Sequence, residues 1–263
     1  MSYVLKILAV GMHRPQPYGF FHIAWVLAAL LTVLLLQKRK GEKLTERVFS
    51  LFGWTALFLE ALKQVSWSFS CGAQGAAVFN YQWYAAPFQL CTTPAYVAAL
   101  YPFIRSVRVR NALRGYLAYF TLLGSVAVAL FPENIYTEEV LINIHTSFLH
   151  MGGLFLSLWL LFSDRVAPKR DFWDGYKVFL CFAGFALVLN IAVYHMANLR
   201  SSGACFDMFY ISPYYTSPVP VFSALDKALP YPLFLFLYLF AFWIGGALIA
   251  YISTAVRRIT RTH

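Results

Sequence analysis

Residues 231–254 read YPLFLFLYLFAFWIGGALIAYIST, a run that contains no charged residue. About 20 apolar residues are enough to cross the hydrocarbon core of a bilayer as a helix. Backbone amides that face lipid need partners within their own segment, so a helix is the structure such a run adopts. Six further stretches of this kind lie at about 20–37, 48–66, 86–104, 112–131, 140–163 and 177–197. We therefore expect an all-α polytopic membrane protein, a single seven-transmembrane-helix bundle over residues 1–263.

The composition agrees with this expectation. Apolar residues make up 60% of the chain and charged residues only 12%, which excludes an ordinary soluble domain. The net charge of +10 does not indicate nucleic-acid binding, because the cations are confined to short loops where they fix topology and contact anionic headgroups. We expect membrane lipids as substrate or surroundings, no nucleic-acid partner, and a location in a bacterial inner membrane or a plasma membrane.

Lysine and arginine alternate between successive loops. The cation-rich segments follow the first, third, fifth and seventh stretches, with Lys38, Arg39, Lys40, Lys43, Arg47, Arg105, Arg108, Arg110, Arg114, Arg165, Lys169, Arg170, Lys177, Arg257, Arg258 and Arg261. The intervening segments hold Lys6, Arg14, Arg200 and Lys227, and Lys63 lies within the second stretch. By the positive-inside rule the N-terminus is outside and the C-terminus is cytoplasmic.

Several side chains that are costly to bury fall at one depth, in the outer half of the expected bundle. They are Glu60, Lys63, Gln89, Cys91, His145, His150, Asn190 and His195. A polar or ionisable group at membrane depth is a functional-site candidate by default. Their common depth predicts one site.

Cys91 is the candidate nucleophile of that site. Proline is favoured in the first turn of a helix, so we expect the third helix to start near Pro87. Cys91 would then lie just over a turn inside the helix N-terminus, where the dipole favours an anion. Pro94 removes the N–H that would bond the carbonyl of Leu90, which opens the helix beside the thiol. The alternative is a packed cysteine next to a proline kink.

Histidines on the neighbouring helices are candidate partners of Cys91. The fifth helix places His145 and His150 at its depth, and the sixth brings Asn190 and His195 to the same level. Cysteine and histidine together form the minimum for a thiol nucleophile with an acid–base partner. Five residues separate the two fifth-helix histidines by about 140°, so their rings do not share a face. Because a zinc site prefers a spacing of four, we expect neither a metal nor a cofactor.

Glu60 and Lys63 are close enough on one helical face to pair. They are either a mutually neutralised ion pair or functional groups, a carboxylate that orients a histidine and a cation that binds a phosphate headgroup. His22 is a further candidate for substrate contact, with snorkelling to the membrane interface as its alternative.

The exterior loops hold two more expectations. Cys71 and Cys205 lie in exterior loops, where disulfides persist, so a structural Cys71–Cys205 bridge is one of two open outcomes. The long segment from about 198 to 230 is aromatic and Pro-rich. Long loops are often lids or binding elements, and this one is either a lid over the pocket or a surface loop.

Short motifs resemble a known family. Residues 87–91, Pro-Phe-Gln-Leu-Cys, resemble the Pro-Leu-His-Leu-Cys stretch of the YwaF-like integral membrane proteins. Residues 148–152, Phe-Leu-His-Met-Gly, are similar to that family's histidine-glycine span. Asn190, with Leu225-Asp226 and the Leu-Pro-Tyr-Pro-Leu run at 229–233, resembles its closing segment. The similarity extends from about residue 55 to 240.

The resemblance implies a chemistry. Eukaryotic relatives of that family include a transmembrane acyltransferase of ether-phospholipid remodelling that uses a cysteine and a histidine. It implies Cys91 as nucleophile and His150 as base, with His145 as a second candidate. Gln89 departs from the family, which often has histidine there, and this puts full activity in doubt.

The leading hypothesis is a lipid acyltransferase or a lipid-ester or thioester hydrolase in the outer-leaflet half. Gln89 and Asn190 would stabilise the oxyanion, and His195, Glu60 and Lys63 would contact substrate. A second hypothesis is a transporter or channel for a small solute or proton, with the same polar set lining a path. A third is a seven-helix ligand sensor.

Overall fold

The computed structural model describes residues 2–39, 41–71, 76–133, 135–163 and 165–261, without the side chains of residues 2, 71 and 258–261. Helices dominate this part of the chain. In order, the elements are α1 Ser2–Leu8, α2 Phe20–Leu36, α3 Glu42–Ser68, β1 Phe69–Cys71, β2 Ala77–Phe79, η2 Trp83–Ala85, α4 Thr93–Leu100, η3 Tyr101–Phe103, α5 Val107–Gly115, η4 Tyr116–Phe120, α6 Thr121–Leu130, α7 Val140–Phe162, α8 Pro168–Met196, α9 Leu199–Ser202, η5 Met208–Tyr210, α10 Pro220–Ala228 and α11 Tyr231–Arg261. Strands β1 and β2 pair antiparallel as a small hairpin after α3.

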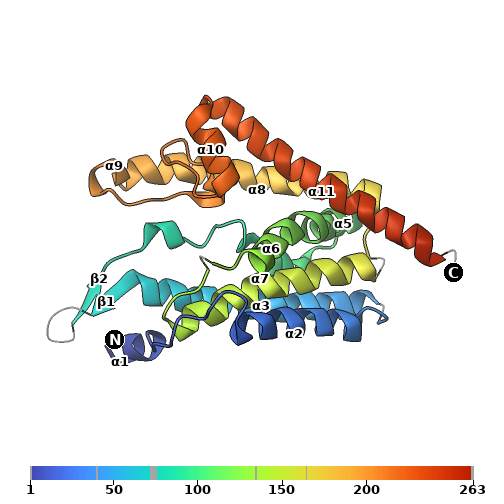
Figure 1. The fold of residues 1–263 in the computed structure, drawn as a ribbon, viewed down its shortest axis with the longest axis horizontal. Coiled ribbons are helices and arrows are strands. Elements are labelled where there is room, and N and C mark those ends of the chain that lie inside the picture. The colour runs from blue at the N-terminus through green and yellow to red at the C-terminus, as the bar shows by residue number, and fades with distance from the viewer. Residues whose placement is uncertain (1, 40, 72–75, 134, 164, 262–263) are drawn as a thin grey trace.

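The long helices run along one another in a bundle (Figure 1). Helix α7 packs against α2, α3 and α6, while α8 packs against α5 and α11. Five helical stretches are long and apolar enough to cross a membrane: α3, the continuous Val107–Leu130 stretch, α7, α8 and α11 up to Arg257. Helix α2 is apolar but shorter, with 17 residues. The protein is therefore an all-α membrane protein with several apolar helices, and the count of seven spans stays a prediction.

The third predicted span differs from the expectation. Residues 86–92 are not helical, and α4 begins only at Thr93. Ala86 is extended, with φ −53° and ψ 148°, because the residue before a proline avoids the α region. Pro94 lies in the first turn of α4, where its missing N–H has no partner to lose. The prediction of a continuous helix over 86–104 that starts near Pro87 and is opened by Pro94 is thus wrong, because the second proline starts the helix.

Small residues let the short helix α4 lie directly against α3. A Cβ on Gly53 would stand 2.3 Å from the backbone nitrogen of Ala99 and 2.9 Å from the carbonyl oxygen of Ala95. Ala95, Ala98 and Ala99 are all buried. Small residues at a crossing bring helix backbones close together, as is common in membranes. This contact fixes the segment that precedes α4.

A π-helical turn, η4, lies at the centre of the bundle. All five of its residues are fully buried, and the turn packs against α5, α6, α7, α8 and α11. Tyr116 hydrogen-bonds Thr93 of α4, with 2.5 Å between the hydroxyl oxygens. Single π-helical turns are rare and occur often at functional sites. The turn ties the start of α4 to the helix that continues as α6.

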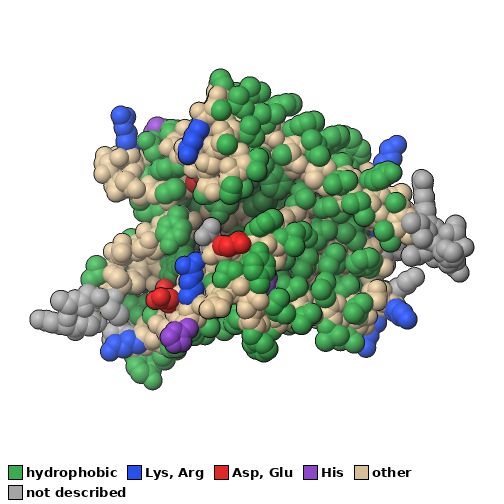
Figure 2. Space-filling model, in the orientation of Figure 1, with side chains coloured by type: hydrophobic (Ala, Val, Ile, Leu, Met, Phe, Trp, Pro, Cys, Tyr) green, Lys and Arg blue, Asp and Glu red, His purple; other side chains and the backbone are tan. Residues whose placement is uncertain are grey.

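The segments richest in cations meet at one end of the bundle. Arg165 donates to the carbonyl of Arg39 at 2.7 Å, Arg114 to that of Arg165 at 3.4 Å, and Arg257 to that of Val166 at 2.7 Å. The two chain ends lie at opposite ends of the molecule (Figure 1). Apolar side chains cover the middle of the visible face, with the visible Lys and Arg nearer its ends (Figure 2). This arrangement fits a bundle that spans a bilayer, while the direction of insertion stays a prediction.

Candidate functional site

A cavity of about 450 Å³ opens between the start of α4, helices α6, α7, α10 and α11, and the loop around Tyr210. Its volume is within the range of about 300–1,000 Å³ found for small-molecule sites. The lining is mostly apolar, and none of the described lining residues is Asp, Glu, Lys or Arg. Cys91 and His150 both line it.

Cys91 lies in a tight turn immediately before α4. The backbone N–H groups of Thr92 and Thr93 both donate to the carbonyl of Gln89, at 2.9 and 3.2 Å. The Tyr96 hydroxyl donates to the carbonyl of Pro87 at 2.5 Å, which ties the segment back onto α4. The half-buried thiol is therefore held on a constrained backbone that faces the cavity.

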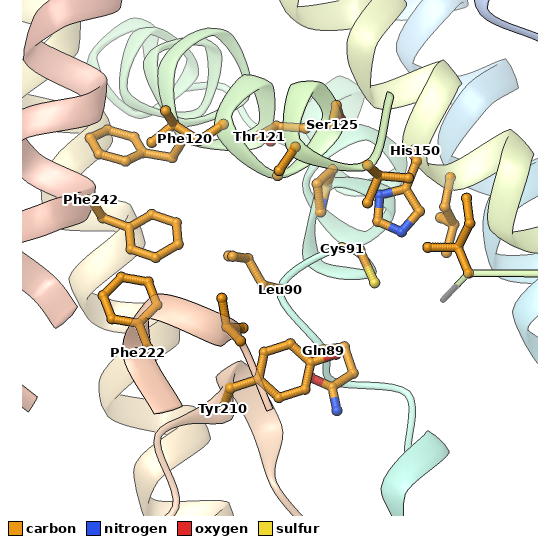
Figure 3. Close-up of a pocket in the computed structure, with 18 of the residues that line it drawn as sticks. Gln89, Leu90, Cys91, Phe120, Thr121, Ser125, His150, Tyr210, Phe222 and Phe242 are labelled. Atoms are coloured by element: carbon orange, nitrogen blue, oxygen red, sulfur yellow. The ribbon is translucent and has the colours of Figure 1, made fainter. Parts of the chain in front are cut away.

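His150 reaches the cavity from α7. Its imidazole and the Cys91 thiol lie toward the same end of the cavity, while Phe222 and Phe242 lie toward the other (Figure 3). The described residues show no hydrogen bond between the thiol and the imidazole. In structures without substrate such catalytic contacts are often long and tighten only when substrate binds. The arrangement places a thiol and an imidazole on the wall of one largely apolar cavity.

His145 points elsewhere. Its Nε2 lies 2.7 Å from Glu60 Oε2, and Glu60 Oε1 accepts from Lys63 Nζ at 2.8 Å and from Gln64 Nε2 at 2.7 Å. Tyr81 in turn donates to Gln64 at 2.9 Å. Glu60, Lys63 and His145 are buried, Gln64 and Tyr81 are partly buried, and none of these residues of the polar cluster lines the cavity. Glu60 therefore pairs with Lys63 and also orients a histidine, but that histidine is not His150.

Gln89 and Asn190 hold the loop around Met208. Gln89 Nε2 donates to the carbonyls of Tyr84 and Asp207, at 3.3 and 3.1 Å, and its Oε1 accepts from the N–H of Phe209. Asn190 pairs with both backbone groups of Met208, at 2.7 and 3.0 Å. Gln89 lines the cavity, whereas the fully buried Asn190 does not. Both amides position the backbone, and this engagement leaves no free N–H on Gln89 for an oxyanion.

The loop that these amides hold closes one side of the cavity. Phe209 and Tyr210 adopt left-handed backbone angles, with φ of 60° and 56°, which costs on the order of 1 kcal/mol or more for such residues. Tyr238 donates to the carbonyl of Phe209 at 2.7 Å and so helps to hold this strained turn. Tyr210 and Val219 line the cavity. Part of the segment at 198–230 therefore borders the cavity, and its role as a lid stays a prediction.

Two predicted contact residues lie away from the cavity. His22 is only 2% exposed and bonds Tyr136 and the carbonyl of Ala129, at 3.0 and 3.1 Å, so it does not snorkel to an interface. His195 lies at the surface, with Nε2 2.8 Å from the Tyr214 hydroxyl. Neither side chain meets Cys91 in the cavity.

Cys205 is exposed and forms no disulfide with a described cysteine, and the side chain of Cys71 lies outside the described residues, so the Cys71–Cys205 bridge stays a prediction. Cys181 is exposed on α8. Within the described ranges, no three His, Cys, Asp or Glu side chains gather as metal ligands would.

Sequence reasoning missed the wall that α6 contributes. Phe120 at the end of η4 lines the cavity with six residues of α6. The six are Thr121, Leu123, Gly124, Ser125, Ala127 and Val128, which together form one broad side of the helix. Thr121 and Ser125 are hydroxyl residues four apart within an apolar stretch, and this pattern was the sequence feature that could have indicated a cavity wall on this helix.

The burial of the Asp207 carboxyl leads us to expect that the stability of the protein depends on pH. It is 4% exposed, and its Oδ1 accepts from the N–H of Ser212 at 2.8 Å. Burial, reinforced by the charge of Asp226, raises the pKa of Asp207 from 3.8 to about 7. The folded protein thus holds this proton more tightly than the unfolded chain, so the stabilisation is complete below about pH 4 and is lost as the pH rises through 7.

Asp207→Asn keeps the amide oxygen for Ser212 and cannot ionise. We expect the wild type to lose about 2–3 kcal/mol relative to this variant between pH 5 and pH 8. Thermal unfolding of the two purified proteins across this range measures the difference. Parallel pH curves for the two proteins would contradict the assignment.

A model of the TMEM164 family matches residues 17–250, most of the chain and the whole of the cavity lining. No curated protein and no solved structure matches. Taken with its apolar helices, the match identifies the chain as an integral membrane protein that belongs to the TMEM164 family.

Proposed function

We propose that the protein transfers an acyl chain from a phospholipid ester, with Cys91 as nucleophile and His150 as general base. The observation that carries the proposal is that both side chains line one apolar cavity inside a membrane protein. A thiol becomes an effective nucleophile when an adjacent base takes its proton. The resemblance of residues 87–91 and 148–152 to the YwaF-like proteins, with their acyltransferase relatives, supports the same pair.

The reaction has two balanced steps. His150 takes the Sγ proton of Cys91, and the thiolate attacks the ester carbonyl. The carbon–oxygen ester bond then breaks, and the leaving lysolipid alkoxide takes that proton from His150. In the second step His150 deprotonates the hydroxyl of an acceptor lysolipid, and the resulting oxygen nucleophile attacks the thioester carbonyl. The carbon–sulfur bond breaks, and His150 returns the proton to the leaving Cys91 thiolate. With water as acceptor the same steps hydrolyse the ester.

The cavity favours a lipid over a water-soluble substrate. Its lining carries aromatic and aliphatic side chains, so it suits the acyl chain of a lipid. The described lining has no Asp, Glu, Lys or Arg, so the charged headgroup of a phospholipid has no counter-charge inside the cavity and would stay outside it. Gln89, the departure from the family motif, holds the Asp207 and Phe209 backbone. Its proposed role is therefore to position the loop, which an amide performs without titrating.

The test is a search for an acyl thioester on Cys91. The purified protein is incubated with a phospholipid carrying a labelled acyl chain, and bound label is released with neutral hydroxylamine, which cleaves thioesters. We expect label on the wild type and none on Cys91→Ala. Cys181→Ala is the matched control, because Cys181 is exposed on α8 and outside the cavity. Equal labelling of Cys91→Ala and the wild type would remove the thiol from the mechanism.

A transporter is the second candidate, and one observation favours it. The buried cluster of Glu60, Lys63 and His145 places ionisable groups within two apolar helices, as proton paths do. Solute or proton flux in liposomes that is lost in Glu60→Gln, without lipid turnover, would support this function.

A further inference from the structure

Helix α6 provides one wall of the cavity, and the centre of that wall has no side chain. Phe120 at the end of η4 and Gly124 and Val128 of α6 follow at spacings of four. Thr121 and Ser125 line the cavity on one side of this row, and Leu123 and Ala127 line it on the other. At 100° per residue, Gly124 lies about midway between Phe120 and Val128 around the helix axis. The cavity-facing surface of α6 is therefore centred near Gly124.

Contacts on the two sides of Gly124 show that it lies between α7 and α11. On one flank, a Cβ on Gly153 of α7 would stand 2.6 Å from Ser125 Oγ and 3.1 Å from Thr121 Cγ2. Gly153 lies three residues, about one turn, after His150, so this flank is the side of the proposed chemistry. On the other flank, a Cβ on Gly246 of α11 would stand 2.9 Å from the Phe120 ring. Gly124 thus lies between the α7 side and the α11 side of the cavity.

The space in front of Gly124 is open. A Cβ built on this residue meets no heavy atom within 4 Å, unlike one on Gly153 or Gly246. Because Gly124 lines the cavity, the open space is the cavity itself. In Figure 3, Cys91 lies toward one end of the cavity and Phe222 and Phe242 toward the other, with Thr121 of α6 along one side between them. A chain that runs from Cys91 to the far end would pass along this side.

We propose that Gly124 is a specificity-determining residue of an acyl-chain site, because its missing side chain leaves the cavity long enough for a long-chain fatty acyl group. This rests on the proposed function only in placing the acyl carbonyl at Cys91. The lining supports the ligand class, since aromatic and aliphatic residues line the space and the described lining has no Asp, Glu, Lys or Arg to bind a headgroup. Protein interiors are close-packed, so volume added at position 124 is volume lost to the ligand.

The test compares Gly124→Leu with Gly184→Leu. Gly184 is the matched control: a Cβ there also meets nothing within 4 Å, but the residue lies on the exposed face of α8 and outside the cavity. Binding is measured by the displacement of a fluorescent fatty acid by saturated fatty acids of graded length. Acyl transfer is measured separately with phospholipids of the same chain lengths.

Leucine adds four carbons, so we expect Gly124→Leu to shorten the preferred chain by roughly four carbons. Affinity for the longest chains should fall at least about tenfold while short chains bind as in the wild type. Gly184→Leu should keep the wild-type length profile. Gly124→Ala, which favours the helix, should give a smaller shift in the same direction, and it serves as the test should the leucine variant fail to fold.

The two readouts separate the two proposals. A wild-type length profile for the folded Gly124 variants, in binding and in transfer, would overturn the role of Gly124. A shifted binding profile together with unchanged thioester labelling in Cys91→Ala would support the acyl site and reject the proposed chemistry. Loss of all labelling in Cys91→Ala, together with a wild-type length profile in the Gly124 variants, would support the proposed chemistry and reject the role of Gly124.

Discussion

His150→Gln is expected to lower the rate of acyl transfer by about 10²–10⁴-fold, the usual contribution of a positioned general base. Glutamine keeps a polar side chain of similar reach at the cavity but cannot take the proton from Cys91. The measurement is the initial rate of release of lysolipid or fatty acid from a labelled phospholipid in detergent or liposomes. The Cys91 thiol should also react more slowly with a lipid-like alkylating agent, because less thiolate forms.

His195→Gln is the matched control for that prediction. His195 lies at the surface and contacts Tyr214 rather than the cavity, so its variant should transfer acyl chains at nearly the wild-type rate. A His150→Gln variant as active as His195→Gln would assign the base to another group. His145 is then the next candidate, and its contact with Glu60 would have to be broken for it to reach the cavity.

The positions of the apolar helices were predictable from local sequence, because the thickness of a bilayer sets the length of an apolar run. Helices α2, α3, α7, α8 and α11 all overlie predicted stretches. The prediction of a continuous helix over the third stretch was wrong for a reason that is also local. Two prolines compete for the first turn of one helix, and Pro94 holds that position in the structure. Sequence alone offers no rule that ranks Pro94 above Pro87.

The candidate site was only partly predictable from the sequence. Common depth nominated Cys91 and His150, which line one cavity, but also nominated His145 and Asn190, which do not. Depth is set by the position of a residue along its helix, whereas a shared cavity depends on the rotation of each helix about its axis. The angle between His145 and His150 separated their faces, but nothing in the sequence showed which face met the cavity.

Long-range contacts were the least predictable part. The pairing of Asn190 with Met208 joins α8 to a strained turn 18 residues later, and Gln89 reaches the same loop from far earlier in the chain. A buried amide with such partners looks, in sequence, the same as one that faces substrate. Phe222 and Phe242 likewise look like ordinary packing residues until α10 and α11 are placed around the cavity.

Glu60→Ala is expected to lower the free energy of unfolding by about 3–5 kcal/mol, because it leaves Lys63 buried without its counter-charge. Lys63 is 7% exposed, its ammonium lies 2.8 Å from Glu60, and His145 and Gln64 lose the same carboxylate. Thermal or denaturant unfolding of the purified protein measures the loss. Water does not reach this cluster readily, so solvent cannot replace the missing partner.

Glu46 on the same helix provides the control. It pairs with Arg110 at 2.6 Å, but its side chain is 30% exposed and so remains partly solvated. We therefore expect Glu46→Ala to cost less than Glu60→Ala, about 1 kcal/mol. The double variant Glu60→Leu/Lys63→Met should recover part of the stability lost in Glu60→Ala, because apolar replacement of a whole buried pair is often close to neutral.

If Glu60→Ala and Glu46→Ala unfold alike, the cluster is hydrated in the membrane. A hydrated Glu60, Lys63 and His145 would in turn favour a proton path over a structural ion pair, so this measurement bears on the choice between the two candidate functions.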